Sequence, residues 1–241
     1  MQLENKIWFR TICTKNEFVI TDLQIEQLDQ YVNLLLDWNK KINLISRKDE
    51  ENFWTYHILH SISPLFKLNI PEESRLVDIG TGGGLPGIPL KILRPDLALL
   101  CIDATRKKAD AVTHMAAELK LKEVNIIWGR AEEVGLQAGF LNTFDFTIAR
   151  AVCRLNELIA LSKNFLRKNS RSPLLSIPID RKGRQDAEPP AIIAFKGGDL
   201  TQEIDQAKRQ YPSADIHSIG LTFAGSEQLI ASDKKLLIVH L

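Results

Sequence analysis

The sequence has few cysteines, little net charge and no long apolar run, and each shortage excludes a class of protein. Its three cysteines, Cys13, Cys101 and Cys153, are odd in number and show no paired spacing. This argues against a disulfide framework and a structural zinc site, and it suits a reducing compartment. No stretch reaches about 18 apolar residues, so we expect no membrane span. The N-terminus carries charges where a signal peptide needs an apolar run, so we expect a cytoplasmic protein.

The net charge of +1 at pH 7 gives the 241-residue chain no overall attraction to nucleic acid. Any contact with RNA must therefore come from local clusters of Lys and Arg, although each cluster alone is more typical of a solvated surface. Hydrophobic residues make up 44% and charged residues 25%, which predicts a globular protein with a sizeable core. The basic clusters are Lys40 and Lys41, Arg47 and Lys48, Arg106 to Lys108, Arg167 to Arg171, and Arg181 to Arg184.

Two segments within the first 70 residues are predicted to be helices. Residues 22–39 repeat apolar side chains at spacings that share one helical face, and Thr21 or Asp22 can cap this helix. A second helix is predicted over residues 50–66. We therefore expect an N-terminal helical extension over residues 1–70, followed by the main domain over residues 71–241.

Short apolar runs alternate with amphipathic segments after Leu76. This alternation implies right-handed crossovers and a mostly parallel sheet that helices cover on both faces. Two further apolar runs near the C-terminus are expected to pair as an antiparallel hairpin at one edge, and residues 168–190 are expected to form a loop. The predicted strands are LVDI, ALLCI, VNIIW, FDFTIA and AIIAF, and the predicted helices cover 86–93, 106–120, 155–167 and 200–210.

A glycine-rich loop follows the first predicted strand, in the stretch VDIGTGGGLPG. Gly80, Gly82 and Gly84 allow positive φ angles or the close approach of the backbone to a ligand. The helix that follows directs free N–H groups at the loop, which favours a bound anion such as a diphosphate or a carboxylate. A tight strand-to-helix turn that binds no ligand is the alternative.

The loop fits two ligands. From Gly82 it satisfies the dinucleotide pattern G-x-G-x-x-G, and from Asp78 it has the acidic-x-G-x-G-x-G form found in methyltransferases that use S-adenosylmethionine. Both ligands require a carboxylate at the end of the second strand to accept hydrogen bonds from ribose hydroxyls, and Asp103 supplies it for either.

Three features favour S-adenosylmethionine. Only about 45 residues follow the strand AIIAFKG, too few for a second nucleotide-binding half. Asp78 lies inside a strand, where it can hold the loop backbone or the ammonium group of the ligand. Ala131 and Glu132 follow the third strand, where a small residue and an acid suit an adenine site.

Several motifs together resemble one family. They are WNKKINLIS, the histidine of TYHILHS, DIGTGGGLPGIPL, IDATRKK, WGRAEE, FDFTIARAV and FKGG, and their order is that of bacterial small-subunit ribosomal RNA methyltransferase G, also called glucose-inhibited division protein B. The resemblance covers about residues 22–165 and resumes at 190. It implies a class I methyltransferase with a Rossmann-like, mostly parallel seven-stranded sheet. It also implies S-adenosylmethionine as cofactor and N7 of a guanine in 16S rRNA as methyl acceptor.

The resemblance also implies cofactor-binding residues. In this chain they are Gly80, Leu85, Ala104, Thr105, Arg106, Ala131, Glu132 and Arg150, in addition to Asp78, Gly82, Gly84 and Asp103. This chain departs from the family at His60, where an acid is usual, and in residues 168–190, which are longer than usual.

The chemistry of N7 predicts a site without a catalytic acid or base. N7 of guanine carries an in-plane lone pair and no proton, so no proton needs to be removed before methyl transfer. The protein would contribute alignment, which supplies up to about 7–11 kcal/mol. Arg150 is expected to position the cofactor or the guanine, with a surface or salt-bridged arginine that closes the fourth strand as the alternative.

Other candidates point to no further site. His57 and His60 share a helix without an accompanying Cys or carboxylate cluster, so packing or capping is favoured and no metal is expected. Cys153 lacks the Pro-Cys pair of cytosine-C5 methyltransferases and is interpreted as a small buried thiol. The helical extension is a candidate for RNA contact, and its alternative function is to cover one face of the sheet; the two functions are compatible, since the outer surface of such a cap is free to bind phosphates.

The leading hypothesis is a monomeric rRNA methyltransferase that acts on 16S rRNA or the small ribosomal subunit. A nicotinamide-dependent oxidoreductase and a non-catalytic RNA-binding module that keeps a methyltransferase fold are the alternatives.

Overall fold

A seven-stranded sheet lies at the centre of the computed structural model, which describes residues 3–46, 52–168 and 184–241. The strand order is β4-β3-β2-β5-β7-β9-β8; the first five strands run parallel, and β9 is antiparallel to both of its neighbours. The strands are β2 (Arg75–Ile79), β3 (Ala98–Asp103), β4 (Val124–Trp128), β5 (Phe146–Arg150), β7 (Ala191–Gly197), β8 (Asp215–Gly220) and β9 (Lys234–His240).

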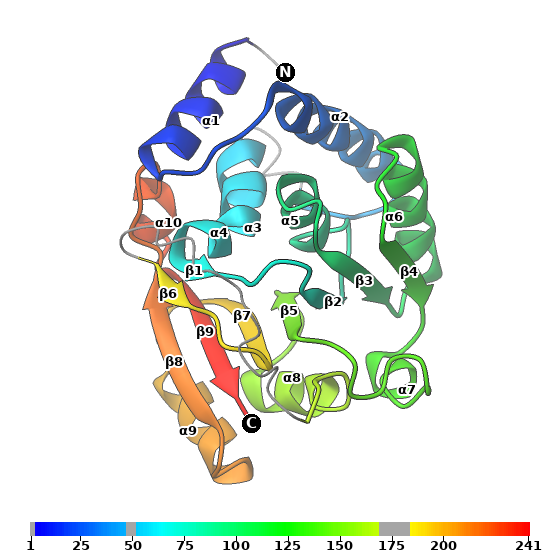
Figure 1. Ribbon diagram of the computed structural model, residues 1–241, viewed down its shortest axis with the longest axis vertical. Coiled ribbons are helices and arrows are strands. Elements are labelled where there is room, and N and C mark those ends of the chain that lie inside the picture. Colours follow the sequence, from blue (N-terminus) through cyan, green and yellow to red (C-terminus); the bar gives the residue numbers. More distant parts are fainter. Residues whose placement is uncertain (1–2, 47–51, 169–183) are drawn as a thin grey trace.

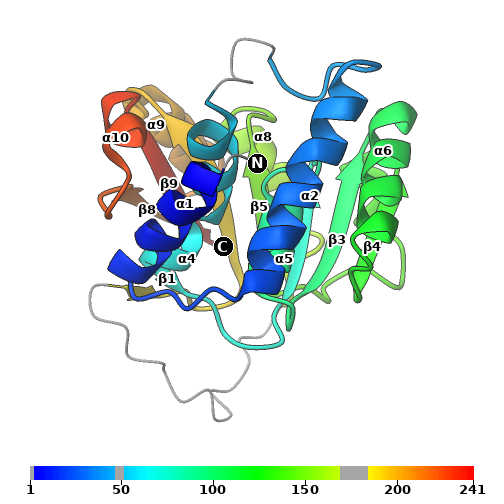
Figure 2. The same cartoon turned by 90° about the horizontal axis from the view of Figure 1, so that it is seen from above.

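Helices cover both faces of this sheet (Figures 1 and 2). One face carries the N-terminal helices together with α5, α6 and α10, whereas α7, α8 and α9 cover the other face. The helices are α1 (Leu3–Lys15), α2 (Asp22–Asn39), α3 (His60–Ile62), α4 (Pro64–Lys67), α5 (Gly87–Leu93), α6 (Arg106–Glu118), α7 (Ala131–Val134), α8 (Leu155–Ser162), α9 (Thr201–Gln210) and α10 (Glu227–Ala231), with a π-helical turn η2 (Trp54–Leu59) before α3.

The central strands are buried on both sides, as their nearly continuous apolar sequences predict. Successive side chains of β2 alternate between the two layers: Leu76 joins the core under the N-terminal helices, and Val77 joins the core under α8 and α9. The predicted class I methyltransferase fold is therefore confirmed, including the seven-stranded, mostly parallel sheet.

The predicted helix over residues 22–39 is confirmed as α2. Thr21 is its N-cap and forms a capping box with Gln24, which satisfies backbone N–H groups at the helix start. The Gln24 side-chain amide also donates to the carbonyl groups of Ile92 and Leu93 at the end of α5. These bonds fix α2 against the helix that follows the glycine loop.

Other expectations hold only in part. The helix predicted over 50–66 is divided into η2, α3 and α4, and the helix predicted over 155–167 ends at Ser162. The C-terminal strands β8 and β9 pair antiparallel at one edge, as expected. The sequence did not indicate α1 or the small parallel sheet of β1 (Leu68–Asn69) and β6 (Gln185–Asp186). Residues 169–183 of the expected loop lie outside the described residues.

The N-terminal helices share one hydrophobic core with the sheet. Phe9 of α1 and Leu28 of α2 belong to the same buried cluster as Leu76 of β2. The division into an extension over 1–70 and a domain over 71–241 stays a prediction. Of the helices in the described part of the chain, none combines the length and hydropathy of a membrane span.

Candidate functional site

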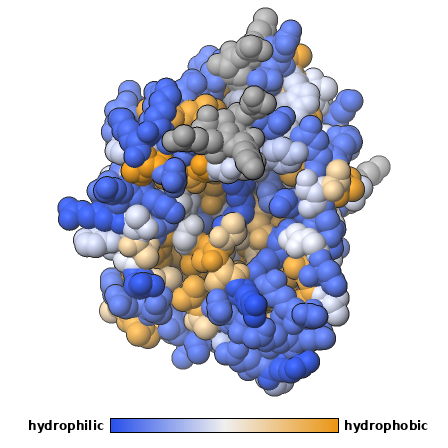
Figure 3. Space-filling model, turned by 180° about the vertical axis from the view of Figure 1, so that it is seen from behind, coloured by the Kyte–Doolittle hydropathy of each residue, from blue (hydrophilic) through white to orange (hydrophobic). Residues whose placement is uncertain are grey.

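The predicted site residues gather at the carboxyl ends of β2, β3, β4 and β5. The chain leaves β2 in one direction, through β3 to β4, and continues with β5 on the opposite side of β2. This change of direction is a topological switch point, where ligands of open α/β sheets bind. The face turned away from the viewer in Figure 1 is hollowed near its centre and has apolar side chains beside the hollow (Figure 3).

The glycine loop supplies the backbone of the site. Gly80, Gly82 and Gly84 have positive φ angles of 67°, 58° and 91°. A Cβ atom on Gly82 would have no neighbour closer than the Gly80 carbonyl oxygen, at 4.0 Å. The missing side chain of Gly82 therefore leaves open space above the loop, as a ligand-binding glycine requires.

The other glycines are required by packing. A Cβ atom on Gly80 would lie 2.8 Å from Cγ2 of Val152, and one on Gly84 would lie 2.7 Å from Cγ1 of Ile88. A Cβ atom at Gly80 or Gly84 would press on a neighbouring side chain, whereas the space at Gly82 is open, so Gly80 and Gly84 shape the loop. Leu85, at its end, is 5% exposed and packs in the core.

Asp78 holds the loop from below. Its side chain is fully buried, and its Oδ2 accepts hydrogen bonds from the Thr81 hydroxyl at 2.7 Å and the Gly87 N–H at 2.9 Å. Burial raises the pKa of the Asp78 carboxyl to about 7, while the hydrogen bonds from Thr81 and Gly87 oppose this shift. Of the two functions considered for Asp78, the geometry supports holding the loop backbone.

Asp103 connects the glycine loop to the end of β3. Its Oδ2 accepts from the Gly82 N–H at 2.9 Å, and its Oδ1 accepts from the Thr105 N–H at 2.8 Å. The carboxylate is 7% exposed beside the open position of Gly82. Each carboxylate oxygen has a second lone pair, so Asp103 can still accept the two hydroxyls of a ribose.

The ends of β3 and β4 form an aromatic and cationic edge. The Trp128 indole N–H donates to the Ala104 carbonyl at 3.1 Å, and the Arg106 guanidinium lies 5.2 Å from the centre of the Trp128 ring. Trp128 nevertheless keeps 57% of its surface exposed. Ala131 begins α7 and is 8% exposed, and Glu132 next to it faces solvent. The structure therefore brings Ala104, Arg106, Ala131 and Glu132 to the same edge of the sheet.

Arg150 connects the end of β5 to the N-terminal helices. Its guanidinium lies 2.6 Å from Nδ1 of His57 and donates to the Tyr56 carbonyl at 3.2 Å. Burial and the adjacent guanidinium lower the pKa of His57 to about 3, so its imidazole is neutral and accepts at Nδ1. Arg150 is therefore not a solvated surface arginine, and its contact with His57 is not a salt bridge. Its guanidinium is held by residues about 93 positions earlier in the sequence.

The sequence pattern missed three contributors to the site. The buried Tyr31 hydroxyl of α2 donates to the Gly83 carbonyl at 2.8 Å, and Val152 packs above Gly80. Lys196 of β7 donates to the Cys153 carbonyl at 2.7 Å and pairs with Glu203 of α9. A helical heptad or a strand ending signals none of the contacts with Gly83, Gly80 and Cys153, because each joins elements far apart in the sequence. Only Glu203 lies close to its partner, seven residues after Lys196. Cys153 itself is only partly buried, and burial raises its pKa.

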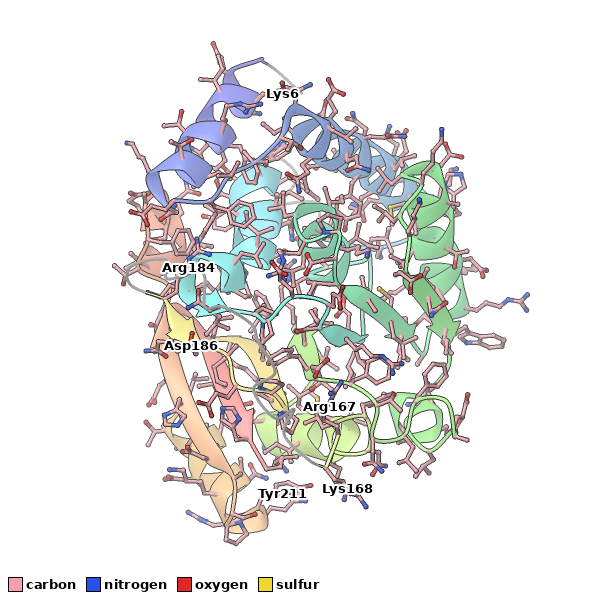
Figure 4. The ribbon with its side chains drawn as sticks, in the orientation of Figure 1. Lys6, Arg167, Lys168, Arg184, Asp186 and Tyr211 are labelled. Carbon is pink, nitrogen blue, oxygen red and sulfur yellow. The ribbon has the colours of Figure 1, made fainter. Side chains whose placement is uncertain are left out.

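Two basic clusters have structural partners. Arg167 pairs with the buried Asp145 at 2.9 Å, and Arg184 donates to the Asn16 carbonyl at 3.0 Å. Figure 4 shows Arg167 beside α8 and Lys168 at the lower margin of the view. Within residues 3–46, 52–168 and 184–241 no three His, Cys, Asp or Glu side chains gather in a way that could hold a metal ion.

Comparisons with known proteins address the family and the fold of the chain. The family described as rRNA small subunit methyltransferase G (GidB) matches residues 24–176. A ribosomal RNA small subunit methyltransferase G from Alkaliphilus metalliredigens is 37% identical over 90% of this chain and 89% of the relative. A ribosomal RNA small subunit methyltransferase G from Porphyromonas gingivalis is 37% identical over 77% of this chain and 75% of the relative. A solved SAM-dependent methyltransferase from Aquifex aeolicus shares the fold, with a TM-score of 0.51 and 12% identity over 80% of this chain and 94% of that chain.

Proposed function

This chain belongs to the rRNA small subunit methyltransferase G family, and from that premise we propose which of its residues carry out the reaction. The function is methylation of guanine N7 in 16S rRNA, and S-adenosylmethionine is the methyl donor. The dinucleotide interpretation of the glycine loop is thereby set aside. We assign cofactor binding to the edge formed by the ends of β2, β3 and β4, and guanine positioning to the end of β5.

The open space at Gly82 is the observation that carries this assignment. The loop backbone there has positive φ, no side chain can enter the space without strain, and the carboxylate of Asp103 lies beside it. A ribose needs an acceptor for its hydroxyls, and a cationic cofactor favours a neighbouring carboxylate. Asp103 provides both. Ala131 leaves room for an adenine, and Glu132 offers an acceptor for its amino group.

The residues of the chain contribute alignment rather than proton transfer. When bound, S-adenosylmethionine supplies a methyl group on a positively charged sulfur. Guanine N7 has no proton to lose, so the neutral His57 is not needed as a base and instead holds the Arg150 fork in place. A guanidinium keeps its charge at all relevant pH values, and that of Arg150 belongs to the end of β5, beside the switch point. Fixed geometry of this kind supplies up to about 7–11 kcal/mol of barrier reduction.

We propose the small ribosomal subunit, or an assembly intermediate of it, as the physical substrate, and a monomer as the active form. The chain has a net charge of +1, so RNA contact must use local cations. Lys40 and Lys41, at the end of α2, and Arg106, at the start of α6, are exposed candidates near the site. The reaction is assigned to the cytoplasm, where ribosomal subunits are present.

The decisive experiment is transfer of tritium from labelled S-adenosylmethionine into small subunits that lack this modification. Digestion and chromatography then identify the labelled nucleoside. The proposal expects 7-methylguanosine. RNA binding without methyl transfer would instead indicate a non-catalytic RNA-binding module. Saturable NAD(H) binding without S-adenosylhomocysteine binding would indicate an oxidoreductase.

A further inference from the structure

A second cavity lies on the side of the switch point away from β3. It has a volume of about 180 Å³ and opens between the carboxyl ends of β5 and β7. Arg150 and Phe195 are register partners on these two strands, so the cavity begins directly beside Arg150. It is lined by Ala149, Ala151, Val152, Cys153, Leu158, Phe195 and Lys196.

Val152 connects this cavity to the glycine loop. The Val152 side chain lines the cavity. The same side chain is the one that a Cβ atom on Gly80 would contact. The cavity and the loop are therefore separated by a single side chain. A group held in the cavity lies next to whatever the loop binds, which is the relation that a methyl acceptor needs to a methyl donor.

The walls of the cavity suit a flat, apolar surface. Ala149, Val152, Leu158 and Phe195 supply aliphatic and aromatic atoms, and His60 packs edge-on against Phe195 at 5.2 Å between ring centres. Enzymes that modify a base take it out of its stack and hold it between apolar or aromatic side chains. The cavity has the size and surface for one such base.

Lys196 is the cationic group of this cavity. Of the three N–H bonds of its ammonium, one is accepted by the Cys153 carbonyl and another by the Glu203 carboxylate, and these are its acceptors among the described residues. Glu203 also accepts from the Leu155 N–H at 2.6 Å. The ammonium is therefore clamped from two sides, and its third N–H is left for an acceptor in the cavity.

A fixed ammonium donor distinguishes guanine from adenine. The edge of guanine that bears N7 also bears the O6 acceptor, whereas adenine has an amino donor at the corresponding position. A lysine that donates to O6 therefore accepts guanine and leaves an unpaired donor against adenine. Because Lys196 is held by Cys153 and Glu203, it cannot readily move to bind N7 itself, and the N7 lone pair stays available for the methyl group.

We propose that the cavity between β5 and β7 holds the target guanine, and that Lys196 selects it by donating a hydrogen bond to O6. The inference rests on the proposed function, because it concerns the acceptor of the same reaction. Glu203 is then a positioning residue that acts through Lys196 and through the backbone of Leu155. Neither residue is needed to bind the cofactor.

The test compares guanine with 2-aminopurine, which keeps N7 and the 2-amino group but lacks O6. Small subunits are reconstituted with either base at the position that the labelling experiment identifies, and kcat/KM for methyl transfer is measured. For the wild-type protein we expect the loss of O6 to cost about 10- to 100-fold. For Lys196→Met we expect a low rate with both bases and a smaller cost of 2-aminopurine than in wild type, because only the intrinsic effect of O6 remains.

The comparison isolates the contact because the intrinsic effect of O6 on N7 reactivity is the same for both proteins. An equal cost of 2-aminopurine in wild type and Lys196→Met would overturn the proposal. If wild-type protein forms no 7-methylguanosine even on guanine-containing subunits, the proposed function itself fails. Glu203→Gln covers the case in which Lys196→Met does not fold: it removes the carboxylate that holds the ammonium, so it should lower the rate and reduce the cost of 2-aminopurine below the wild-type value. An undiminished cost of 2-aminopurine in Glu203→Gln would assign selectivity elsewhere.

Cys153 allows a second test on the wild-type protein. It lines the cavity and is partly exposed, while Cys13 and Cys101 are buried. Methyl methanethiosulfonate at alkaline pH should add a small group to Cys153 only, abolish methyl transfer and leave S-adenosylhomocysteine binding unchanged. Bound subunits should protect the thiol. Full modification with undiminished transfer would contradict a guanine in this cavity.

Discussion

The two halves of the carboxyl edge are built from unlike parts. The half at β2 and β3 consists of open backbone and the carboxylate of Asp103. The half at β5 and β7 consists of the cations Arg150 and Lys196, set beside an apolar cavity. The first half complements a cationic cofactor with ribose hydroxyls, and the second complements an RNA base with acceptor atoms and a nearby phosphate.

The halves also differ in how they are held. The carboxylate half is local: Asp78 braces Thr81 and Gly87, and Asp103 braces Gly82 and Thr105. The cationic half depends on more distant elements, because Arg150 is fixed by His57, 93 residues earlier, and Lys196 by the Cys153 carbonyl, 43 residues earlier, in addition to the nearby Glu203. Substitutions should therefore separate into those that impair cofactor binding and those that impair transfer.

The largest effect is expected for Gly82→Val. The substitution places a β-branched residue at φ 58°, which costs about 1–2 kcal/mol, and fills the open space above the loop. We expect the Kd for S-adenosylhomocysteine to rise more than about 100-fold, or more than about 2.7 kcal/mol. Calorimetric titration measures this. Gly139→Val is the control, since a Cβ at Gly139 meets nothing within 4 Å; unchanged affinity in a folded Gly82→Val protein would refute the loop assignment.

Asp103→Asn should have the next largest effect. The amide replaces one oxygen by a donor, which must then face the N–H of Gly82 or of Thr105. Losing a charge-assisted acceptor costs about 1.5–3 kcal/mol, so the cofactor Kd should rise about 10- to 100-fold. Asp110→Asn is a matched change on the exposed side of α6. Equal effects of the two substitutions would show that Asp103 makes no special contribution.

Arg150→Ala tests the cationic half. We expect kcat for methyl transfer to fall about 10- to 100-fold, because a charge-assisted donor worth about 1.5–3 kcal/mol is lost near the acceptor. The cofactor Kd should change by less than about threefold, and stability should fall by about 1 kcal/mol. Arg150→Lys should not restore the rate, since a lysine lacks the planar fork that contacts His57 and Tyr56. Near-normal turnover in Arg150→Ala would assign the residue to structure alone.

The smallest effect is a pH dependence of stability caused by His57. Its pKa is about 3 in the folded protein and 6.5 for a free imidazole, so the unfolded chain binds the additional proton. Stability contributed by the neutral imidazole is present above pH 6.5 and is lost as the pH falls towards 3, by up to about 1.4 kcal/mol per pH unit.

The comparison with His57→Gln isolates this contribution. Asp78 has the opposite sign, because its raised pKa of about 7 favours the folded state at low pH and the gain is lost as the pH rises. The difference in unfolding free energy between wild type and His57→Gln should shrink as the pH falls from 6.5. Urea titrations between pH 4 and 8 measure it. A difference independent of pH would contradict a neutral, buried His57.

The two halves were not equally predictable from the sequence. Asp78, Gly82 and Asp103 lie within one strand–helix–strand unit that runs from β2 through α5 to β3, so local spacing predicts their arrangement correctly. Arg150 was recognised as a candidate, but its partner His57 lies 93 residues earlier and appeared to be a packing residue. Lys196 and Val152 belong to the motifs FKGG and FDFTIARAV, but the sequence assigns them no function, because their functions arise from the pairing of β5 with β7 and from the contact with Gly80.

The helical extension shows the same limit. Periodicity predicted α2 with its cap, because capping and an apolar face are local properties. It predicted a continuous helix where the chain forms the π-helical turn η2, whose Tyr56 carbonyl receives Arg150. Such turns are frequent at functional sites, and the tertiary contact with β5 is absent from any local pattern.

The separation of the two halves is tested most directly by equilibrium binding of S-adenosylhomocysteine to wild type, Gly82→Val and Lys196→Met in parallel. We predict that Gly82→Val loses binding by more than about 100-fold, while Lys196→Met stays within about threefold of wild type although its methyl transfer is impaired. A Lys196→Met protein that is folded and loses the cofactor as completely as Gly82→Val would contradict the account.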